Sequence, residues 1–344
     1  MTDTAQAALA DAPLVGLDAI REAAERLRGI AVRTPLVAFG TLPGGAPVVL
    51  KAESLQPIGA FKIRGAYNAI ALLSSEERAR GVVTHSSGNH AQGVARAARL
   101  LGVRATIVMP SDAPAVKRRR VEADGATIVT VGTASGDRED MANRLVEERG
   151  LVLVPPYDDD RVIAGQGTVG LEIVEEVPDL AAVLVPIGGG GLASGVASAV
   201  KLLRPEVRVV GVEPELAADA QESLRSGRIV RWQATRTSRT IADGTRSQAI
   251  GRRPFAHLSR RLDDVVTVTE AQIAAAVRLV AEESRLVVEP SGALAPAAAR
   301  YRFREAGLEH LAGTIVAVVS GGNVDPDRYR ELLASPVPGG GTSG

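Results

Sequence analysis

Lys62 stands in the octapeptide GAFKIRGA, residues 59–66, with Phe61 and Ile63 on either side of it. The chain uses arginine for almost every positive charge, since its 40 basic residues include only four lysines: Lys51, Lys62, Lys117 and Lys201. A lysine amine that loses its proton in apolar surroundings can form an imine, which a guanidinium cannot do. Lys62 is therefore a candidate nucleophile, and the alternative is a lysine at a helix start whose stem lies along its apolar neighbours.

Four consecutive glycines, Gly188, Gly189, Gly190 and Gly191, stand between a stretch typical of a buried strand and the helical pattern ASGVASAVKLL. The backbone N–H groups of such a loop can surround an anion, and the dipole of the following helix adds to the attraction. The pattern therefore favours a phosphate site over a merely flexible turn. It is neither a P-loop, because no Lys-Ser/Thr pair follows, nor the dinucleotide fingerprint, because the glycine spacing differs.

The segment SSGNHAQG, residues 86–93, repeats this order of strand, turn and helix earlier in the chain. Polar donors come from its first five residues, Ser86, Ser87, Gly88, Asn89 and His90. Hydroxyls and free amides at a helix start suit a carboxylate, which makes this segment a candidate substrate site. The alternatives are an ordinary Ser or Asn helix cap and, for His90, a packing role.

Two further polar segments follow apolar, strand-like stretches. Ser320 begins SGGN, and residues 289–291 belong to EPSG. Ligands of parallel sheets lie at the carboxyl ends of the strands. Both segments are thus placed to reach a bound ring, unless they are only turns.

Glu213, Glu215 and Asp219 follow the stretch VRVVGV and form a carboxylate cluster. Their spacing allows a hard cation such as Mg²⁺ or Ca²⁺ to be chelated together with a backbone carbonyl, whereas exposed acids at a helix start are the commoner explanation. An imine-forming lysine, a phosphate site and a carboxylate site are together what pyridoxal phosphate and an amino acid require. Their joint occurrence is more specific than any one of them.

Alternating strand and helix patterns position these candidates. Helical spacing of apolar residues predicts a first helix over 17–30, and short strands over 33–37 and 47–53 precede a helix from Lys62 to about Leu73. From Gly81 onward strands and helices alternate, which predicts parallel sheets with crossover helices. Further strands are expected at 82–86, 105–110, 127–131, 151–156, 181–187, 207–214, 265–269, 286–290 and 313–320, and further helices at 90–102, 113–123, 136–149 with Ser135 as its cap, and 162–177.

The predicted fold class is α/β, with two doubly wound parallel-sheet lobes. A smaller lobe is expected over residues 76–155. A larger, discontinuous lobe is expected over 1–75 and 156–333, with a loose leader at 1–14. Residues 334–344, which are rich in glycine and have nothing to bury, are expected to be disordered.

Composition narrows the class of protein. The 344 residues suit two lobes, and the 40 basic residues equal the 40 acidic ones, which gives no electrostatic footprint for nucleic acid or an anionic membrane. The absence of cysteine excludes disulfides and thiolate chemistry. No apolar run reaches the roughly 20 residues that span a bilayer, and the N-terminus lacks the features of a signal peptide. We therefore expect a soluble cytoplasmic protein with a small-molecule ligand.

Over nearly all of residues 17–330 the sequence resembles the serine/threonine dehydratase and serine racemase family of fold-type II pyridoxal-phosphate enzymes. The stretches that carry the resemblance are AFKIRGA, SSGNHAQGVA, VIAGQGT, GGGGL, TIADG, VEPSGA and SGGN. The resemblance implies the tryptophan synthase β-like architecture, pyridoxal 5'-phosphate as cofactor, and a homodimer or homotetramer.

By this resemblance Lys62 would hold the cofactor as an imine, and residues 188–191 would bind its phosphate. Asn89 would contact the ring hydroxyl, Ser320 the ring nitrogen, and Phe61 would pack beside the ring. A neutral hydroxyl does not hold the ring nitrogen protonated as a carboxylate would, which favours prompt elimination over transamination.

The resemblance also assigns a substrate loop and a metal site. Residues 86–90 would bind the substrate, and the family's second acid/base serine corresponds to Ser87, on the face of the ring opposite the lysine. The family's divalent-cation site corresponds to Glu213, the carbonyl of Ala217, and Asp219.

Two positions depart from the family pattern. Ala60 stands where many members have serine, and Tyr157 stands where racemases carry asparagine near the ring. Because Tyr157 favours a dehydratase, we expect β-elimination that converts L-threonine or L-serine to 2-oxobutanoate or pyruvate plus ammonia. Serine racemase and 3-hydroxyaspartate dehydratase are the alternatives, since residues 219–230 resemble the latter and Arg138 is a candidate partner for an acidic side chain. Rivals from other classes are a pyridoxal-phosphate carrier or sensor without turnover and a nucleotide-binding protein.

Overall fold

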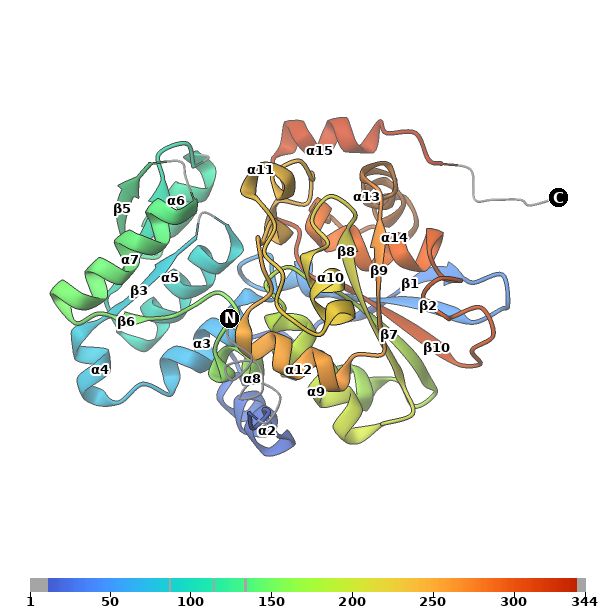
Figure 1. Ribbon diagram of the computed structural model, residues 1–344, viewed down its shortest axis with the longest axis horizontal. Coiled ribbons are helices and arrows are strands. Elements are labelled where there is room, and N and C mark those ends of the chain that lie inside the picture. The colour runs from blue at the N-terminus through green and yellow to red at the C-terminus, as the bar shows by residue number, and fades with distance from the viewer. Residues whose placement is uncertain (1–11, 87, 114, 133–134, 339–344) are drawn as a thin grey trace.

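The computed structural model describes residues 12–338 except 87, 114, 133 and 134. Two sheets lie side by side, each flanked by helices (Figure 1). Ser87, most of the predicted leader and residues 339–344 of the predicted tail lie outside the described residues. The predicted α/β class is confirmed, because both sheets are mainly parallel and are crossed by helices.

The larger sheet has six strands in the order β1-β2-β10-β7-β8-β9. All neighbouring strands are parallel except β1 and β2, which form an antiparallel edge. The strands are β1 (Leu36–Thr41), β2 (Pro47–Ala52), β10 (Thr314–Val319), β7 (Leu180–Pro186), β8 (Arg208–Pro214) and β9 (Asp264–Val268).

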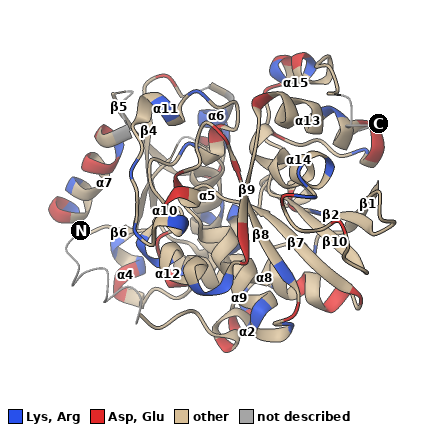
Figure 2. Ribbon diagram, turned by 45° about the vertical axis from the view of Figure 1, so that its right-hand side comes forward, with Lys and Arg blue, Asp and Glu red and all other residues tan. Residues whose placement is uncertain are grey.

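The smaller sheet has four parallel strands in the order β5-β4-β3-β6. Its strands are β3 (Val82–His85), β4 (Ala105–Pro110), β5 (Thr127–Val131) and the short β6 (Val152–Leu153). The helices of this region are α4 (Ser75–Arg80), α5 (Asn89–Leu101), α6 (Ala115–Ala123) and α7 (Ser135–Arg149). Basic and acidic residues are mixed over outer helices such as α7 and α15 (Pro326–Leu333) (Figure 2).

The larger sheet is buried on both faces, as parallel sheets usually are. In β7, Ala182 and Leu184 belong to the apolar cluster on one face, and Val183 and Val185 to the cluster on the other. The remaining helices and 3₁₀ turns are α2 (Leu17–Arg26), η1 (Glu53–Leu55), α3 (Lys62–Ala71), α8 (Asp160–Glu176), α9 (Gly191–Leu203), α10 (Asp219–Ser226), α11 (Ala234–Thr237), η2 (Asp243–Thr245), α12 (Arg252–Arg261), α13 (Glu270–Ser284), η3 (Pro290–Ala293) and α14 (Leu294–Tyr301).

Helices α3, α8 and α9 cross one another at glycines. A Cβ at Gly165 of α8 would lie 2.7 Å from the carbonyl oxygen of Arg64 in α3, and a Cβ at Gly195 of α9 would lie 2.4 Å from the backbone nitrogen of Gly167 in α8. Only glycine permits backbones to approach so closely. These crossings tie the helix that begins at Lys62 to the helix that follows the glycine loop.

The strand expected at 286–290 is wrong. Arg285 ends α13 in the left-handed region, at φ 60°, and Pro290 opens η3 without a backbone N–H to donate. The segment between them instead crosses the end of β10, where the Glu289 N–H donates to the Gly321 carbonyl at 3.1 Å. The strand expected at 33–37 begins only at Leu36, after Pro35.

The division into lobes at residues 75 and 156 stays a prediction. Ile63, Ala66 and Ile70 of α3 pack in the same apolar cluster as Ile107 and Val82 of the smaller sheet, although the predicted boundary assigns α3 to the larger lobe. No helix in the described part of the chain is long and apolar enough to cross a membrane.

Candidate functional site

The segment before Lys62 lies against the end of the central strand β10. Ala60 forms an isolated antiparallel bridge with Gly321, and the Phe61 N–H donates to the Ser320 carbonyl at 3.1 Å. Lys62 then begins α3. The strand end that carries Ser320 and the helix start that carries the lysine are therefore held side by side, although they lie far apart in the chain.

The Lys62 amine differs from the other three lysine amines. Its Nζ donates to the Pro156 carbonyl at 2.7 Å and forms no ion pair among the described residues, and it lies 5.0 Å from the centre of the Phe61 ring. Desolvation lowers the pKa of Lys62 to about 8. The other three lysines are paired with carboxylates: Lys51 with Glu172 at 2.8 Å, Lys117 with Asp243 at 3.1 Å and Lys201 with Asp263 at 2.7 Å. Lys62 is thus the lysine best suited to nucleophilic attack.

The glycine loop connects the end of β7 to the start of α9. Gly190 has φ 93° and precedes the first residue of the helix, Gly191. The first-turn N–H groups of a helix have no acceptors within the helix, and no side chain caps this one. The loop therefore presents free amide donors at a positive helix end, which fits a phosphate.

Tyr157 closes the glycine loop from one side. A Cβ at Gly189 would lie 2.1 Å from the Tyr157 Cδ1 atom, and a Cβ at Gly190 would lie 2.7 Å from the Cβ of Pro254. A side chain at Gly189, Gly190 or Gly191 would therefore collide with these walls. Burial raises the pKa of Tyr157 to about 12, with Asp158 and Asp219 adding to the effect, so Tyr157 stays a neutral phenol.

The described part of the 86–90 segment forms the turn and first residues of α5. The Gly88 N–H donates to Ser86 Oγ at 3.2 Å, and Asn89 begins the helix without a side-chain cap. His90 is buried with Nε2 3.0 Å from the Val154 carbonyl, and burial, followed by the charge of Lys62, lowers the pKa of His90 to about 3. His90 is therefore a neutral neighbour of the lysine. Ser87 lies outside the described residues.

Helix α5 is held near the lysine by a close helix contact and by a hydrogen bond to the residue before η3. A Cβ at Gly93 of α5 would lie 3.1 Å from the Lys62 carbonyl oxygen. Asn89 Nδ2 donates to Glu289 Oε1 at 2.6 Å. Burial, followed by the charge of Asp243, raises the pKa of Glu289 to about 7. Ser320 is also buried and donates from Oγ to the Ser291 carbonyl at 3.4 Å.

The structure brings Glu213 and Asp219 together and leaves Glu215 exposed. Glu213 accepts the N–H groups of Ala220 and Gln221 at 3.0 and 2.7 Å, at the start of α10. Burial raises the pKa of Asp219 to about 7, while burial and the Asp219 charge raise that of Glu213. Asp219 Oδ2 is buried and accepts no hydrogen bond from any residue that the structure describes. The pair therefore needs a shared proton or a cation.

Within the described residues no three or more His, Cys, Asp or Glu side chains form a group that could hold a metal ion. A cation at this pair would have two carboxylates, with further oxygens from backbone carbonyls such as that of the buried Ala217 or from water. Such a ligand set fits Mg²⁺ or Ca²⁺ and excludes the softer metals that need histidine or thiolate.

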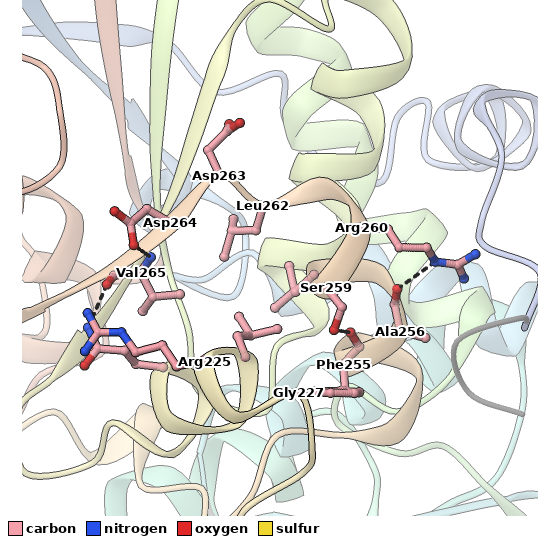
Figure 3. Close-up of a pocket in the computed structure, with 13 residues that line it drawn as sticks. Arg225, Gly227, Phe255, Ala256, Ser259, Arg260, Leu262, Asp263, Asp264 and Val265 are labelled. Atoms are coloured by element: carbon pink, nitrogen blue, oxygen red, sulfur yellow. Dashed lines mark hydrogen bonds between the residues drawn. The ribbon is translucent and has the colours of Figure 1, made fainter. Parts of the chain in front are cut away.

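A cavity of about 540 Å³ lies elsewhere, between α10, α12 and β9. Its wall includes Leu224, Phe255 and Leu262, with Arg225 at its edge (Figure 3). None of the residues predicted for the cofactor, the substrate or the metal lines this cavity. The candidate site is instead the region where the Lys62 segment, the end of β10, the glycine loop and the start of α5 meet.

Sequence reasoning missed two partners in this region. The Pro156 carbonyl that accepts from Lys62 follows β6, and no side-chain pattern marks a backbone acceptor. Asn323 belongs to the SGGN stretch, but its bond to Asn89 joins residues 234 positions apart, which local patterns do not record.

Comparison with known proteins shows which proteins this chain is similar to. A family model described as "Pyridoxal-phosphate dependent enzyme" matches residues 27–321. An L-threo-3-hydroxyaspartate ammonia-lyase of Saccharomyces cerevisiae is 43% identical over 93% of this chain and 97% of the relative. An L-threonine ammonia-lyase of Thermotoga maritima is 43% identical over 93% of this chain and 78% of the relative. The solved structure of maize serine racemase has a TM-score of 0.88 and 40% identity, and the match covers 93% of this chain and 97% of that one.

Proposed function

The chain belongs to the pyridoxal-phosphate dependent enzymes, and on that premise we propose that it is a lyase that releases ammonia from a hydroxyamino acid by β-elimination. L-Threonine and L-serine are the proposed substrates, with 2-oxobutanoate and pyruvate as products. The observation that carries the proposal is the Lys62 amine, which is desolvated and forms no ion pair with any described residue. It lies close to the uncapped start of α5, whose donors suit a carboxylate.

The residues of this region fit the cofactor. Lys62 would attach it, the amides of 188–191 would bind its phosphate, Asn89 and Ser320 would contact its ring, and Phe61 would lie beside it. A side chain at Gly189, Gly190 or Gly191 would collide with Tyr157 or Pro254, which supports a loop that binds an anion through its backbone. When bound, pyridoxal phosphate withdraws electrons from an amino acid's α carbon and makes its C–H bond acidic.

The protein's own residues would bind the substrate and move its protons. Ser86, Gly88 and Asn89 would receive the substrate carboxylate at the helix start, with the neutral His90 behind them. Lys62 Nζ would accept the α proton, which requires the neutral amine that its lowered pKa supplies near pH 8. Ser87 would lie on the opposite face as the second acid/base group, which a racemase would use to return a proton.

One observation favours a second candidate substrate, 3-hydroxyaspartate. Arg138 of α7 is half-buried, and no carboxylate of the described chain forms an ion pair with it. Burial lowers the pKa of His85, the residue before Ser86, and the charge of Glu139 opposes this effect. Arg138 is close enough to His85 for its own charge to lower that pKa further. An arginine at this place supports binding of a substrate with a second carboxylate.

Three finer properties complete the proposal. The pair Glu213 and Asp219 would bind Mg²⁺ or Ca²⁺ with the Ala217 carbonyl, which the unpartnered Asp219 Oδ2 supports. The chain would form a homodimer or homotetramer, since Leu55 and Val287 are 48% and 51% exposed and exposed apolar side chains suit contact with a second copy. The absence of cysteine supports a reducing, cytoplasmic setting.

A substrate panel tests the proposal. Purified holoenzyme is given L-threonine, L-serine and L-threo-3-hydroxyaspartate, and release of the 2-oxo acid is followed by a coupled assay while chiral chromatography follows any D-amino acid. We expect the highest kcat/KM for threonine or serine, with elimination faster than racemisation. D-Serine that accumulates faster than pyruvate would overturn the proposal in favour of a racemase. Activity on 3-hydroxyaspartate alone, lost in Arg138→Met, would move it to the acidic substrate.

A further inference from the structure

Asn89 begins α5, which packs against the smaller sheet. Its side chain nevertheless forms hydrogen bonds with two residues near the larger sheet. Its Nδ2 donates to Glu289 Oε1 at 2.6 Å, and its Oδ1 accepts from Asn323 Nδ2 at 2.8 Å. Glu289 stands directly before η3 and Asn323 shortly after β10. The amide at the start of α5 is therefore held from both of its ends.

The orientation of the Asn323 amide is determined by its other partners. Asn323 Oδ1 accepts from Arg120 Nη1 at 2.6 Å, and Asn323 Nδ2 also donates to the Ile58 carbonyl at 2.8 Å. A guanidinium can only donate and a carbonyl can only accept. If the oxygen and nitrogen of Asn323 were exchanged, its N–H would face the Arg120 guanidinium and its oxygen would face the Ile58 carbonyl. Asn323 must therefore present its N–H to Asn89.

The orientation of the Asn89 amide follows from that of Asn323. Its oxygen must face the Asn323 N–H, because the reverse would oppose two N–H donors. Its nitrogen then faces the Glu289 carboxyl. The nitrogen carries two hydrogens, and Glu289 receives one of them. No described residue accepts the other.

The Asn89 nitrogen that carries this hydrogen lies beside the end of β10. A Cβ at Gly321 would lie 2.4 Å from Glu289 Oε1 and 3.2 Å from Asn89 Nδ2, so the pair rests directly on the backbone that follows Ser320. Ser320 is the residue proposed to contact the ring nitrogen. We propose that Glu289 and Asn323 are positioning residues, which fix the Asn89 amide so that its remaining N–H donates to the oxygen on the ring of the bound cofactor.

The inference rests on cofactor binding and not on which amino acid is the substrate. Its readouts are therefore the affinity for pyridoxal phosphate and the visible absorption of the holoenzyme, both of which can be measured without turnover. A failed substrate panel would leave these readouts untouched, and the two proposals can fail separately.

The sharpest test reverses the donors and acceptors around Asn89. Asn323→Asp removes the N–H that Asn89 Oδ1 accepts, and Glu289→Gln provides an N–H in place of an acceptor oxygen. In the double variant the new carboxylate at position 323 can accept from Asn89 Nδ2 while the new amide at position 289 donates to Asn89 Oδ1, so both bonds can form with the Asn89 amide turned round. Asn323→Asp alone should lower the melting temperature and weaken cofactor affinity about tenfold, the loss expected for one charge-assisted hydrogen bond.

The double variant should recover the part of the lost melting temperature that came from the bonds of Asn89, but not the part from the Ile58 carbonyl, which loses its donor in both variants. It should keep the weakened affinity, with an absorption band shifted from that of the parent protein. Recovery of affinity together with stability would overturn the proposal, because it would show that the two residues only hold the protein together. Asn89→Ala provides a second check, since Glu289→Ala should weaken affinity less than about twofold further in that background if it acts through Asn89. Fully additive losses would also overturn the proposal. Lys201→Met, which breaks a surface ion pair with Asp263 far from Asn89, Glu289 and Asn323, is the control and should leave the absorption band in place.

Discussion

Lys62 and Arg64 lie two residues apart on α3, and their surroundings shift the pKa values of the two side chains in opposite directions. Lys62 has a single carbonyl partner, and desolvation lowers its pKa to about 8. Arg64 is fully buried, but the carboxylates of Glu53 and Glu172 outweigh the effect of burial and raise its pKa. Burial removes the charge of a cation only where no counter-charge accompanies it.

The Arg64 site is a buried ionic network. The guanidinium bonds both oxygens of Glu53 at 2.8 Å and both oxygens of Glu172 at 2.6 and 3.0 Å. Burial alone would raise the pKa of Glu53, but Arg64 reverses the effect and lowers it. Lys51 joins the network through Glu172 and the Thr34 carbonyl. The network fixes the start of α3. Lys62, two residues away, takes no part in it, so its amine is available as a nucleophile.

Removing the reactive amine should have the largest effect. In Lys62→Ala we expect turnover to fall on the order of 10⁴-fold, because both the point of attachment and the proton acceptor are lost. The visible absorption that borohydride bleaches should also be lost, while the circular dichroism spectrum stays unchanged. Lys201→Ala, at a surface ion pair, is the control, and peptide mapping of the reduced protein that found the adduct on Lys51, Lys117 or Lys201 would refute the assignment.

Removing the paired cation should damage stability instead. Arg64→Met leaves Glu53 buried without its main counter-charge, which should lower the free energy of unfolding by about 3–5 kcal/mol. Urea denaturation measures this loss. The triple change Arg64→Met, Glu53→Leu and Glu172→Leu should recover part of it, since no buried charge then lacks a partner. An Arg64→Met protein as stable as the parent would contradict the contrast between the two sites.

The pH dependence of cofactor attachment sharpens the comparison further. Only a neutral amine attacks an aldehyde, and Lys62 should be about half neutral at its pKa of about 8. The rate at which cofactor-free protein forms an imine with pyridoxal phosphate should thus rise about tenfold per pH unit below that value and level off above it. A rate that keeps rising toward pH 10.5, the ordinary value of a lysine, would show that the amine is not desolvated.

Glu213 and Asp219 extend the comparison to buried acids without a counter-charge. The pKa of Asp219 is raised from 3.8 to about 7, so the folded state holds a proton that the unfolded chain has released across that interval. In protein freed of divalent cations, stability should therefore fall as pH rises from about 4 to about 7.

A cation that replaces the proton should reverse this loss. We expect Mg²⁺ or Ca²⁺ to raise the melting temperature by about 4 °C near pH 8 and by much less near pH 5. Asp219→Asn serves as the control, because it removes the charge that the cation would neutralise. Equal effects at the two pH values, or none, would refute a cation site at this pair.

The sequence predicted where strands end more successfully than it predicted which side chains form hydrogen bonds with one another at those ends. Apolar runs bounded by glycine located the strands before Gly188 and at Ser320, because parallel strands share one carboxyl edge and motifs after them must gather there. The run at 286–290 looked the same but failed, since Arg285 and Pro290 turn the chain away from the sheet. The bond between Asn89 and Glu289 joins residues 200 positions apart and depends on how α5 packs against the segment before η3, which periodicity and local propensity do not encode.

The position of β10 also sets the order in which this protein can be completed. It is made after β1, β2, β7, β8 and β9, yet it lies between β2 and β7 and pairs with both. During synthesis the ribosome must therefore release residues 314–319 before the two halves of the sheet can join, and the long chain separation makes this a late and slow step. Because the segment before Lys62 is held by the residues that follow β10, we expect the chain to acquire its cofactor only after that last strand has been inserted.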